Sequence, residues 1–241
     1  LLRKTVVKAL VLAAGRGKRM RPLTDSLPKP LLQAGSRRLI DYSIDGLVIA
    51  GITEIVINAA HLSHTFEPLL GRRYRGATIE YSIEGADYEH SLETLGGIAK
   101  ALPLLTDGTE PFIVTAGDIA SDFDFKSLIS QADVLKRGQV DAHLILVPNP
   151  DFHPQGDMGL VDGRVTRQTR DYTFSSIGLY APRLFKDVPV VFAKLFPWLD
   201  SAIEKGRVTG EVFRGQWDNV GTPEALAELT LYSGHRVGLL L

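Results

Sequence analysis

Two hydrophobic patterns alternate along the first 147 residues of the chain. Short, continuously apolar runs, typical of buried strands, are followed by stretches whose apolar residues recur every three or four positions, as on one face of a helix. This order predicts an α/β fold of three layers, in which a mainly parallel, mixed sheet lies between two layers of helices. The expected strands are residues 6–13, 54–59, 78–83, 112–116 and 142–147, and the expected helices are residues 40–48, 61–70, 93–105 and 125–136.

The pattern changes after residue 147. Residues 148–163 are rich in Pro, Gly, Asp and Asn, which predicts a loop or a hairpin. Thr222 is expected to be the N-cap of a closing helix, because a proline and a glutamate follow it in the first turn. No internal repeat or linker interrupts the chain, so we expect a single domain over residues 1–241. Further strands are expected at residues 172–180 and 211–213, and further helices at residues 195–205 and 222–233.

The overall composition excludes several classes of site and partner. The chain contains no cysteine, which excludes disulfides, thiolate zinc sites and cysteine nucleophiles. Lys and Arg together number 27 and Asp and Glu 28, so no net field favours a nucleic acid or a membrane as partner. No apolar run approaches the roughly 18 residues of a membrane span, and the first residues lack the pattern of a signal peptide. We therefore expect a cytoplasmic protein, while the sequence gives no indication of its oligomeric state.

A glycine-rich and strongly basic segment follows the first expected strand. The apolar run of residues 6–14 stops at Gly15 and Gly17. The cations of this segment are Arg16, Lys18, Arg19, Arg21 and Lys29. Glycines at a strand end let backbone N–H groups approach a ligand, and clustered cations favour an anion such as a polyphosphate. The segment is neither a Walker loop nor a dinucleotide fingerprint, because Met20 stands where the latter needs its third glycine.

The alternative interpretation of this segment is a surface turn with solvated cations. Two features favour a phosphate site instead. The segment directly follows a buried strand, and prolines on both sides of Lys29 hold that residue in a stiff stretch of chain.

Asp118 is the second candidate site residue. It follows the expected strand 112–116 after a glycine. Ligands of α/β sheets bind beyond the carboxyl ends of the strands, where the loop at Gly15 also lies. A carboxylate next to a polyphosphate is a usual ligand of Mg²⁺. A turn or helix-capping aspartate is the alternative, and the neighbouring basic loop favours the metal ligand.

A third candidate is the polar pair Asp218 and Asn219, which stands before a glycine turn and the capped closing helix. The same residues could form no more than a strand–loop–helix junction.

Other kinds of catalytic site have little support in the sequence. The six histidines show no spacing typical of a metal site, and no serine has the Gly-x-Ser-x-Gly context of a hydrolase.

Taken together, these segments resemble the signature of the sugar-1-phosphate nucleotidyltransferases. The N-terminal part is Leu12-Ala-Ala-Gly-Arg-Gly-Lys-Arg-Met-Arg-Pro-Leu-Thr, followed by Pro28-Lys-Pro-Leu. Further matching segments are Ile55-Val-Ile-Asn-Ala-Ala-His, Leu92-Glu-Thr-Leu-Gly-Gly-Ile, Ala116-Gly-Asp, Thr173-Phe-Ser-Ser-Ile and Trp217-Asp-Asn-Val-Gly-Thr-Pro. The resemblance covers nearly the whole chain, and the short bacterial N-acetylmuramate 1-phosphate uridylyltransferases are the most similar subgroup.

The resemblance implies a Rossmann-like, GT-A-like fold and a Mg²⁺-dependent reaction. A sugar 1-phosphate oxygen attacks the α-phosphorus of a nucleoside triphosphate, and pyrophosphate leaves. For the subgroup, the substrates are UTP and N-acetylmuramate 1-phosphate, in peptidoglycan recycling. The resemblance also implies a nucleotide-binding half, residues 1–147, and a half that faces the sugar phosphate, residues 148–241.

The resemblance assigns a role to individual residues. Arg19 and Lys29 would stabilise and join the phosphates, and Asp118 would be catalytic as the ligand of Mg²⁺, with Asn219 at the second metal position. The nucleotide-binding residues would be Ala13, Ala14, Gly15, Gly17, Glu93 and Gly96. The sugar-phosphate-binding residues would be Gly159, Ser176 and Lys194.

The chain departs from the family pattern at three places. Asn219 stands where the family usually has an aspartate, and Asp218 would point to the opposite face if the segment is a strand. Leu95 replaces the first glycine of a Gly-rich run, and an additional stretch at residues 86–91 precedes it. These departures leave two alternatives open. One is another pair of substrates, such as GTP and mannose 1-phosphate, and the other is a nucleotide-sugar-binding protein with weak turnover.

Overall fold

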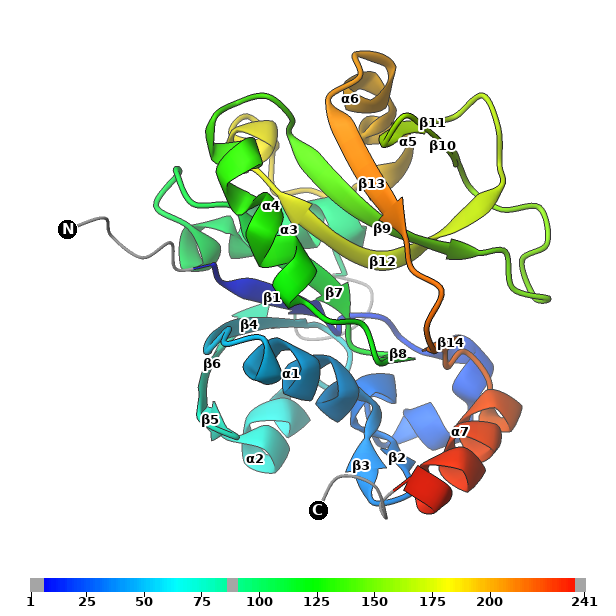
Figure 1. Ribbon diagram of the computed structural model, residues 1–241. Helices are drawn as coiled ribbons and strands as arrows, with labels where there is room; N and C mark the ends of the chain where they lie inside the picture. Colours follow the sequence, from blue (N-terminus) through cyan, green and yellow to red (C-terminus); the bar gives the residue numbers. More distant parts are fainter. Residues whose placement is uncertain (1–6, 86–90, 237–241) are drawn as a thin grey trace.

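A ten-stranded sheet runs through the middle of the molecule in the computed structural model, which describes residues 7–85 and 91–236 (Figure 1). Strands β5, β11 and β12 run opposite to the other strands of this sheet, so the expected mixed, mainly parallel sheet is confirmed. The spatial order is β10 (Gly159–Val161), β11 (Arg164–Thr166), β13 (Val208–Val212), β9 (Ala142–Pro148), β12 (Tyr172–Tyr180), β7 (Phe112–Ala116), β1 (Ala9–Leu12), β4 (Glu54–Ala59), β6 (Ala77–Ile83) and β5 (Arg73–Tyr74).

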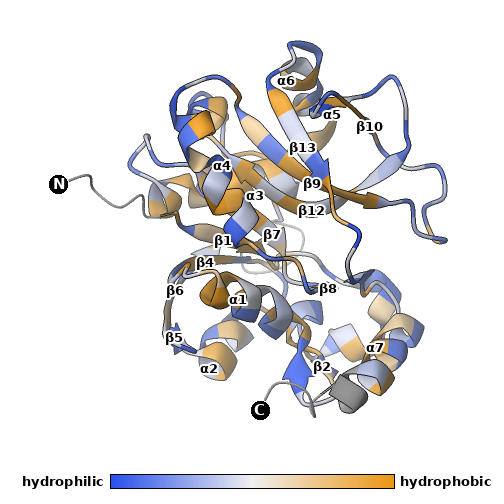
Figure 2. Cartoon of the chain, viewed as in Figure 1, coloured by the Kyte–Doolittle hydropathy of each residue, from blue (hydrophilic) through white to orange (hydrophobic). Residues whose placement is uncertain are grey.

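Helices cover both faces of the sheet and complete the three predicted layers (Figure 1). One face packs against α1 (Leu39–Ile49), α2 (Phe66–Leu70) and α4 (Lys126–Lys136), and the other against α3 (Glu93–Leu105), α5 (Leu195–Trp198) and α6 (Asp200–Glu204). Alternate side chains of a strand enter opposite cores, because successive side chains of a strand point to opposite faces. The central strands are accordingly apolar along their length (Figure 2).

A third, smaller apolar cluster lies beside the sheet. It joins α7 (Pro223–Arg236) to Met20 and to a pair of short strands, β8 (Ile119–Ser121) and β14 (Trp217–Asn219). A hairpin of β2 (Gln33–Ala34) and β3 (Arg37–Arg38) contributes to the same cluster. The hydroxyl of Thr222 accepts a hydrogen bond from the N–H of Ala225 at 3.3 Å, so the predicted N-cap is confirmed.

The described elements differ from the predicted ones where the chain turns sharply. The helix expected at residues 61–70 is a 3₁₀ turn (Ser63–Thr65) followed by the short α2, after Leu62 in a left-handed conformation. The helix expected at residues 195–205 is replaced by two short helices, α5 and α6, and Phe196 within α5 is extended before Pro197. Strand β13 extends over Val208–Val212 rather than residues 211–213, since it pairs in parallel with β9.

Residues 86–90 of the additional stretch lie outside the part of the chain that the structure describes. Within the described part, no helix is both long and apolar enough to cross a membrane.

His143 on β9 couples the stability of the sheet to pH. Its side chain is 6% exposed, its Nδ1 lies 2.9 Å from the hydroxyl oxygen of Thr209, and burial lowers its pKa below the ordinary 6.5. The unfolded chain therefore binds a proton that the folded protein does not, and folding stability falls as the pH falls below about 6.5.

We expect the free energy of unfolding, measured in urea, to decrease between pH 7 and pH 5 with a limiting slope of about 1.4 kcal/mol per pH unit from this group. His143→Gln should remove that part of the slope, whereas His64→Gln at an exposed histidine should keep it. Equal slopes for His143→Gln and the wild type would contradict this assignment.

Candidate active site

The segment after β1 folds back on itself around Gly17. This glycine has a φ of +64°, and a Cβ there would lie 2.9 Å from Cγ2 of Thr24 and 3.0 Å from Cβ of Lys29. The buried Thr24 donates its hydroxyl hydrogen to the carbonyl of Gly17 at 2.9 Å. Only glycine satisfies both the backbone angle and this close approach. The turn therefore brings the loop of residues 15–19 against Lys29.

Lys29 and Asp118 meet at the carboxyl edge of the sheet. Nζ of Lys29 lies 2.5 Å from Oδ2 of Asp118, and the two side chains are 11% and 28% exposed. Lys29, which stands between Pro28 and Pro30, begins a 3₁₀ turn (Lys29–Leu31). Gly117 donates its N–H to the carbonyl of Leu12 at 2.8 Å, which ties the end of β7 to the end of β1. Residues distant in sequence thus meet because their strands are neighbours.

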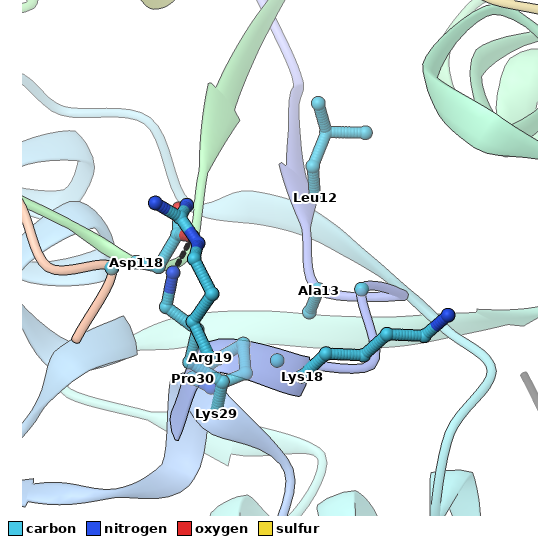
Figure 3. A pocket seen from close by; sticks show the side chains of 10 residues that line it. Leu12, Ala13, Lys18, Arg19, Lys29, Pro30 and Asp118 are labelled. Atoms are coloured by element: carbon cyan, nitrogen blue, oxygen red, sulfur yellow. Dashed lines mark hydrogen bonds and ion pairs between the residues drawn. The ribbon is translucent and has the colours of Figure 1, made fainter. Parts of the chain in front are cut away.

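A cavity of about 240 Å³ lies over this ion pair. Figure 3 shows Arg19 and Lys29 directed toward Asp118, whereas Lys18 extends in another direction. The structure therefore places the predicted Ala13, Gly15, Gly17, Arg19, Lys29 and Asp118 around one cavity, and Ala14 is buried next to it. The lining residues are Leu12, Ala13, Gly15, Gly17, Lys18, Arg19, Lys29, Pro30, Asp118 and Gly221.

Strand β14 brings the C-terminal part of the chain to this cavity. Asn219 pairs with Ile119 of β8, and the N–H of Val220 donates to the carbonyl of Asp118 at 3.1 Å. A side chain at Gly221 would come within 3.1 Å of the guanidinium of Arg19, so glycine there lets Arg19 lie over the cavity. Asp218 is exposed, as expected for the opposite face of the strand.

The side chains at this edge are of the kinds that bind Mg²⁺ together with phosphate groups. The register pairs Asn219 with Ile119, the residue after Asp118, so a carboxylate and a side-chain amide come from adjacent stretches of backbone. Mg²⁺ is commonly held by one or two carboxylates together with substrate phosphates. Within residues 7–85 and 91–236, no group of three or more His, Asp or Glu side chains forms a complete protein cage for a metal.

Glu93 and Gly96 lie at the start of α3, outside the cavity lining. Leu95 and Gly96 donate their N–H groups to the carbonyl of Ala193 at 3.0 and 3.3 Å. A Cβ at Gly96 would be 2.0 Å from the carbonyl oxygen of Val191. The segment before α5 therefore covers Gly96, and close packing explains this glycine without a ligand.

Two buried polar residues connect the start of α3 to the loop, and sequence reasoning missed both. Asn58, at the end of β4, accepts a hydrogen bond from the N–H of Ala13 at 2.8 Å. It also donates to Glu84, just after β6, which accepts from the N–H of Leu92 at 2.7 Å. Burial raises the pKa of Glu84. Their signal in the sequence was a polar side chain at the end of a buried strand.

The candidates for the sugar phosphate come from β10, from β12 and from the segment before α5. Ser176 has a φ of +64° in a bulge of β12, and its neighbour Ser175 accepts a hydrogen bond from the indole N–H of Trp217 at 3.0 Å. Lys194 is exposed before α5. A Cβ at Gly159 would collide with the hydroxyl of Thr169, so this glycine serves packing in β10. None of the predicted Gly159, Ser176 and Lys194 lines the cavity described above.

The chain is similar to several nucleotidyltransferases. A family model described as nucleotidyl transferase matches residues 8–164. The chain is 43% identical over 234 residues to an N-acetylmuramate alpha-1-phosphate uridylyltransferase of Neisseria meningitidis serogroup B, covering 95% of this chain and 99% of that protein. A mannose-1-phosphate guanyltransferase beta-B of Xenopus laevis is 33% identical over 123 residues, which are 51% of this chain and 34% of that protein. A solved structure, a putative glucose-1-phosphate thymidylyltransferase of Bacillus anthracis in complex with a sucrose, has a TM-score of 0.78 at 18% identity, covering 94% and 95% of the two chains.

Gly17→Ala tests how the loop is held. The methyl group combines an unfavourable left-handed backbone with contacts to Thr24 and Lys29, so we expect a loss of roughly 1–3 kcal/mol in the free energy of unfolding. Because Lys29 is displaced, the affinity for a nucleoside triphosphate, measured by calorimetry, should also fall. Gly51→Ala is the matched control, since Gly51 has a φ of +87° and open space around it. The loop assignment is wrong if both variants bind nucleotide like the wild type.

Proposed function

Since the chain belongs to the nucleotidyl transferase family, we propose that it is a uridylyltransferase that joins UTP to N-acetylmuramate 1-phosphate and releases pyrophosphate. The relative from Neisseria meningitidis supports these substrates, because the similarity extends over almost the whole of both chains. The mannose-1-phosphate guanyltransferase is similar over a smaller part of its length.

The observation that carries the proposal is the group of Arg19, Lys29 and Asp118 around one cavity at the carboxyl edge of the sheet. The phosphate oxygen of the sugar 1-phosphate attacks the α-phosphorus of the triphosphate, and the bond to the departing pyrophosphate breaks. Such a transfer depends on positioning and on charge stabilisation, so it needs no covalent nucleophile. Lys29 would hold the phosphates of both substrates together, and Arg19 would stabilise the charge of the departing pyrophosphate.

The backbone of Ala13, Ala14, Gly15 and Gly17 would hold the nucleotide. The segment that contains Glu93 would lie beside the base, with Gly96 supporting it through its packing under the carbonyl of Val191. In this proposal residues 1–147 form the nucleotide-binding half. Residues 148–241 form the half that faces the sugar phosphate, with Ser176, Lys194 and the segment around Gly159 as its candidate contacts.

Mg²⁺ is the proposed cofactor, since the family generally uses a divalent metal. Asp118 and Asn219 would hold the ion, whose positive charge would offset that of the phosphates. The pairing of Asn219 with Ile119, the residue after Asp118, supports this assignment.

One observation favours a second candidate function. Asn219 is neutral, so it holds a divalent ion less strongly than a carboxylate would. A nucleotide-sugar-binding protein with weak turnover is therefore the alternative to an efficient transferase. A transferase with another base and sugar, such as GTP with mannose 1-phosphate, is the alternative for the substrates.

Pyrophosphate release tests the proposal directly. Purified protein is incubated with Mg²⁺ and each combination of four nucleoside triphosphates with N-acetylmuramate, mannose, glucose and N-acetylglucosamine 1-phosphates. We expect UTP with N-acetylmuramate 1-phosphate to give the highest kcat/KM. A higher value for another pair would reassign the substrates. Nucleotide binding without release from any pair would support the binding protein instead.

Asn219→Asp tests the second metal position. A carboxylate there adds a charged oxygen, so the Mg²⁺ concentration for half-maximal rate should fall by roughly tenfold. Asp218→Asn is the control, because this neighbour is exposed on the other face of β14 and its change should leave the Mg²⁺ dependence unaltered. An unchanged Mg²⁺ requirement in Asn219→Asp would remove Asn219 from the metal site.

A further inference from the structure

The side-chain amide of Asn58 occupies a defined position between two parts of the candidate site. Its side chain is 2% exposed, and its Oδ1 accepts the N–H of Ala13 at 2.8 Å. Its Nδ2 donates to Oε1 of Glu84. Ala13 lines the cavity and leads into the loop of residues 15–19, the phosphate-binding loop, so Asn58 fixes one wall of the cavity through this hydrogen bond.

Glu84 holds the start of α3 through its second carboxylate oxygen. Oε2 accepts the N–H of Leu92 at 2.7 Å, at the residue before α3 begins. Both carboxylate oxygens therefore act as acceptors, one for Asn58 and one for Leu92. Helix α3 packs closely against both side chains and leaves no space between itself and them. A Cβ at Gly97 would lie 2.4 Å from Oε1 of Glu84 and 2.7 Å from Nδ2 of Asn58.

These contacts form a continuous chain from the loop at Ala13 to the start of α3. The backbone groups at its two ends are both donors, so the two side chains between them must present an acceptor at each end and one N–H···O bond in the middle. An amide and a carboxylate satisfy this requirement together. Two amides leave two donors facing each other, and two carboxylates leave two acceptors and two charges facing each other in a buried site.

We propose that Asn58 and Glu84 are a positioning pair, which sets the distance and orientation between the phosphate-binding loop and the segment beside the base. This inference rests on the proposed function, since it takes the loop and the start of α3 as the two walls of the nucleotide site. Neither side chain needs to touch the nucleotide. Each acts through the backbone amide that it holds, Asn58 through Ala13 and Glu84 through Leu92.

The positioning role predicts that the pair functions equally well when its two residues are exchanged. In the double variant Asn58→Asp with Glu84→Gln, the aspartate accepts the N–H of Ala13, the glutamine amide donates to the aspartate, and the glutamine oxygen accepts the N–H of Leu92. Charge and shape at the pair are retained, and only the direction of the middle hydrogen bond is reversed. A carboxylate at position 84 that contacted the nucleotide itself would be lost in this variant.

The test compares the two single variants, the double variant and the wild type. UTP affinity is measured by calorimetry, KM for UTP and kcat by pyrophosphate release, and folding by thermal unfolding. We expect each single variant to raise the Kd and KM for UTP by at least about tenfold with a smaller effect on kcat, and the double variant to return within about threefold of the wild type. Gln139→Glu, an exposed amide-to-carboxylate change just before β9 at the opposite edge of the sheet, should bind UTP normally.

Two results would overturn the positioning pair. One is normal UTP affinity in both single variants. The other is a double variant as impaired as the single variants while it still melts like the wild type, which would assign direct ligand contact to Glu84. Failure of the proposed function is distinguishable from either result. In that case the wild type would release no pyrophosphate from any combination of substrates, while its nucleotide affinity could still be compared with that of the variants.

Discussion

The ion pair of Lys29 and Asp118 is the interaction on which the candidate site depends. It joins two residues that are 89 positions apart, and it is only partly exposed to solvent. Removing one member of such a pair leaves an uncompensated charge at the edge of the sheet. Each side chain thus holds the other at the cavity. An anionic substrate would replace Asp118 as the partner of Lys29, and a cation would replace Lys29 as the partner of Asp118.

The remaining structure places this pair and encloses it. Adjacent parallel strands β1 and β7 bring the basic loop and Asp118 to one edge, and β14 brings Asn219 and Gly221 beside them. Glycines are used where two chain segments approach closely, as at Gly17 and Gly97, and not only where a ligand is expected. The fold therefore determines the site through neighbouring strand ends, and α7 and its apolar cluster hold the last of these ends in place.

Most of the central fold could be predicted from the sequence, because long and regular hydrophobic patterns dominate there. The predicted bounds of β4, α3, β7 and β12 match those of the structure. Short elements were missed for a physical reason. Strands as short as β8 and β14 contain too few residues for a pattern, and their pairing depends on chain segments that are far apart in the sequence.

The candidate site was predictable where chemistry is concentrated in one segment. The glycines and cations of residues 15–29 predicted a polyphosphate site, and Gly15, Gly17, Lys18, Arg19 and Lys29 line one cavity together with Asp118. Asn58 and Glu84 were not predicted, because single polar residues at strand ends have no distinctive spacing. The roles of Ser176 and Lys194 stay predictions, since these residues lie outside the cavity lining.

A crystal structure of the protein with Mg²⁺ and a UTP analogue that cannot be cleaved at the α–β bridge would test the central claim most directly. The account predicts that the triphosphate lies between the loop of residues 15–19 and Lys29, within contact distance of Arg19, and that the ion is bound by Asp118. A triphosphate bound elsewhere, for example in the open depression formed by His64, Arg72 and Tyr81, with the Lys29–Asp118 pair undisturbed, would contradict it.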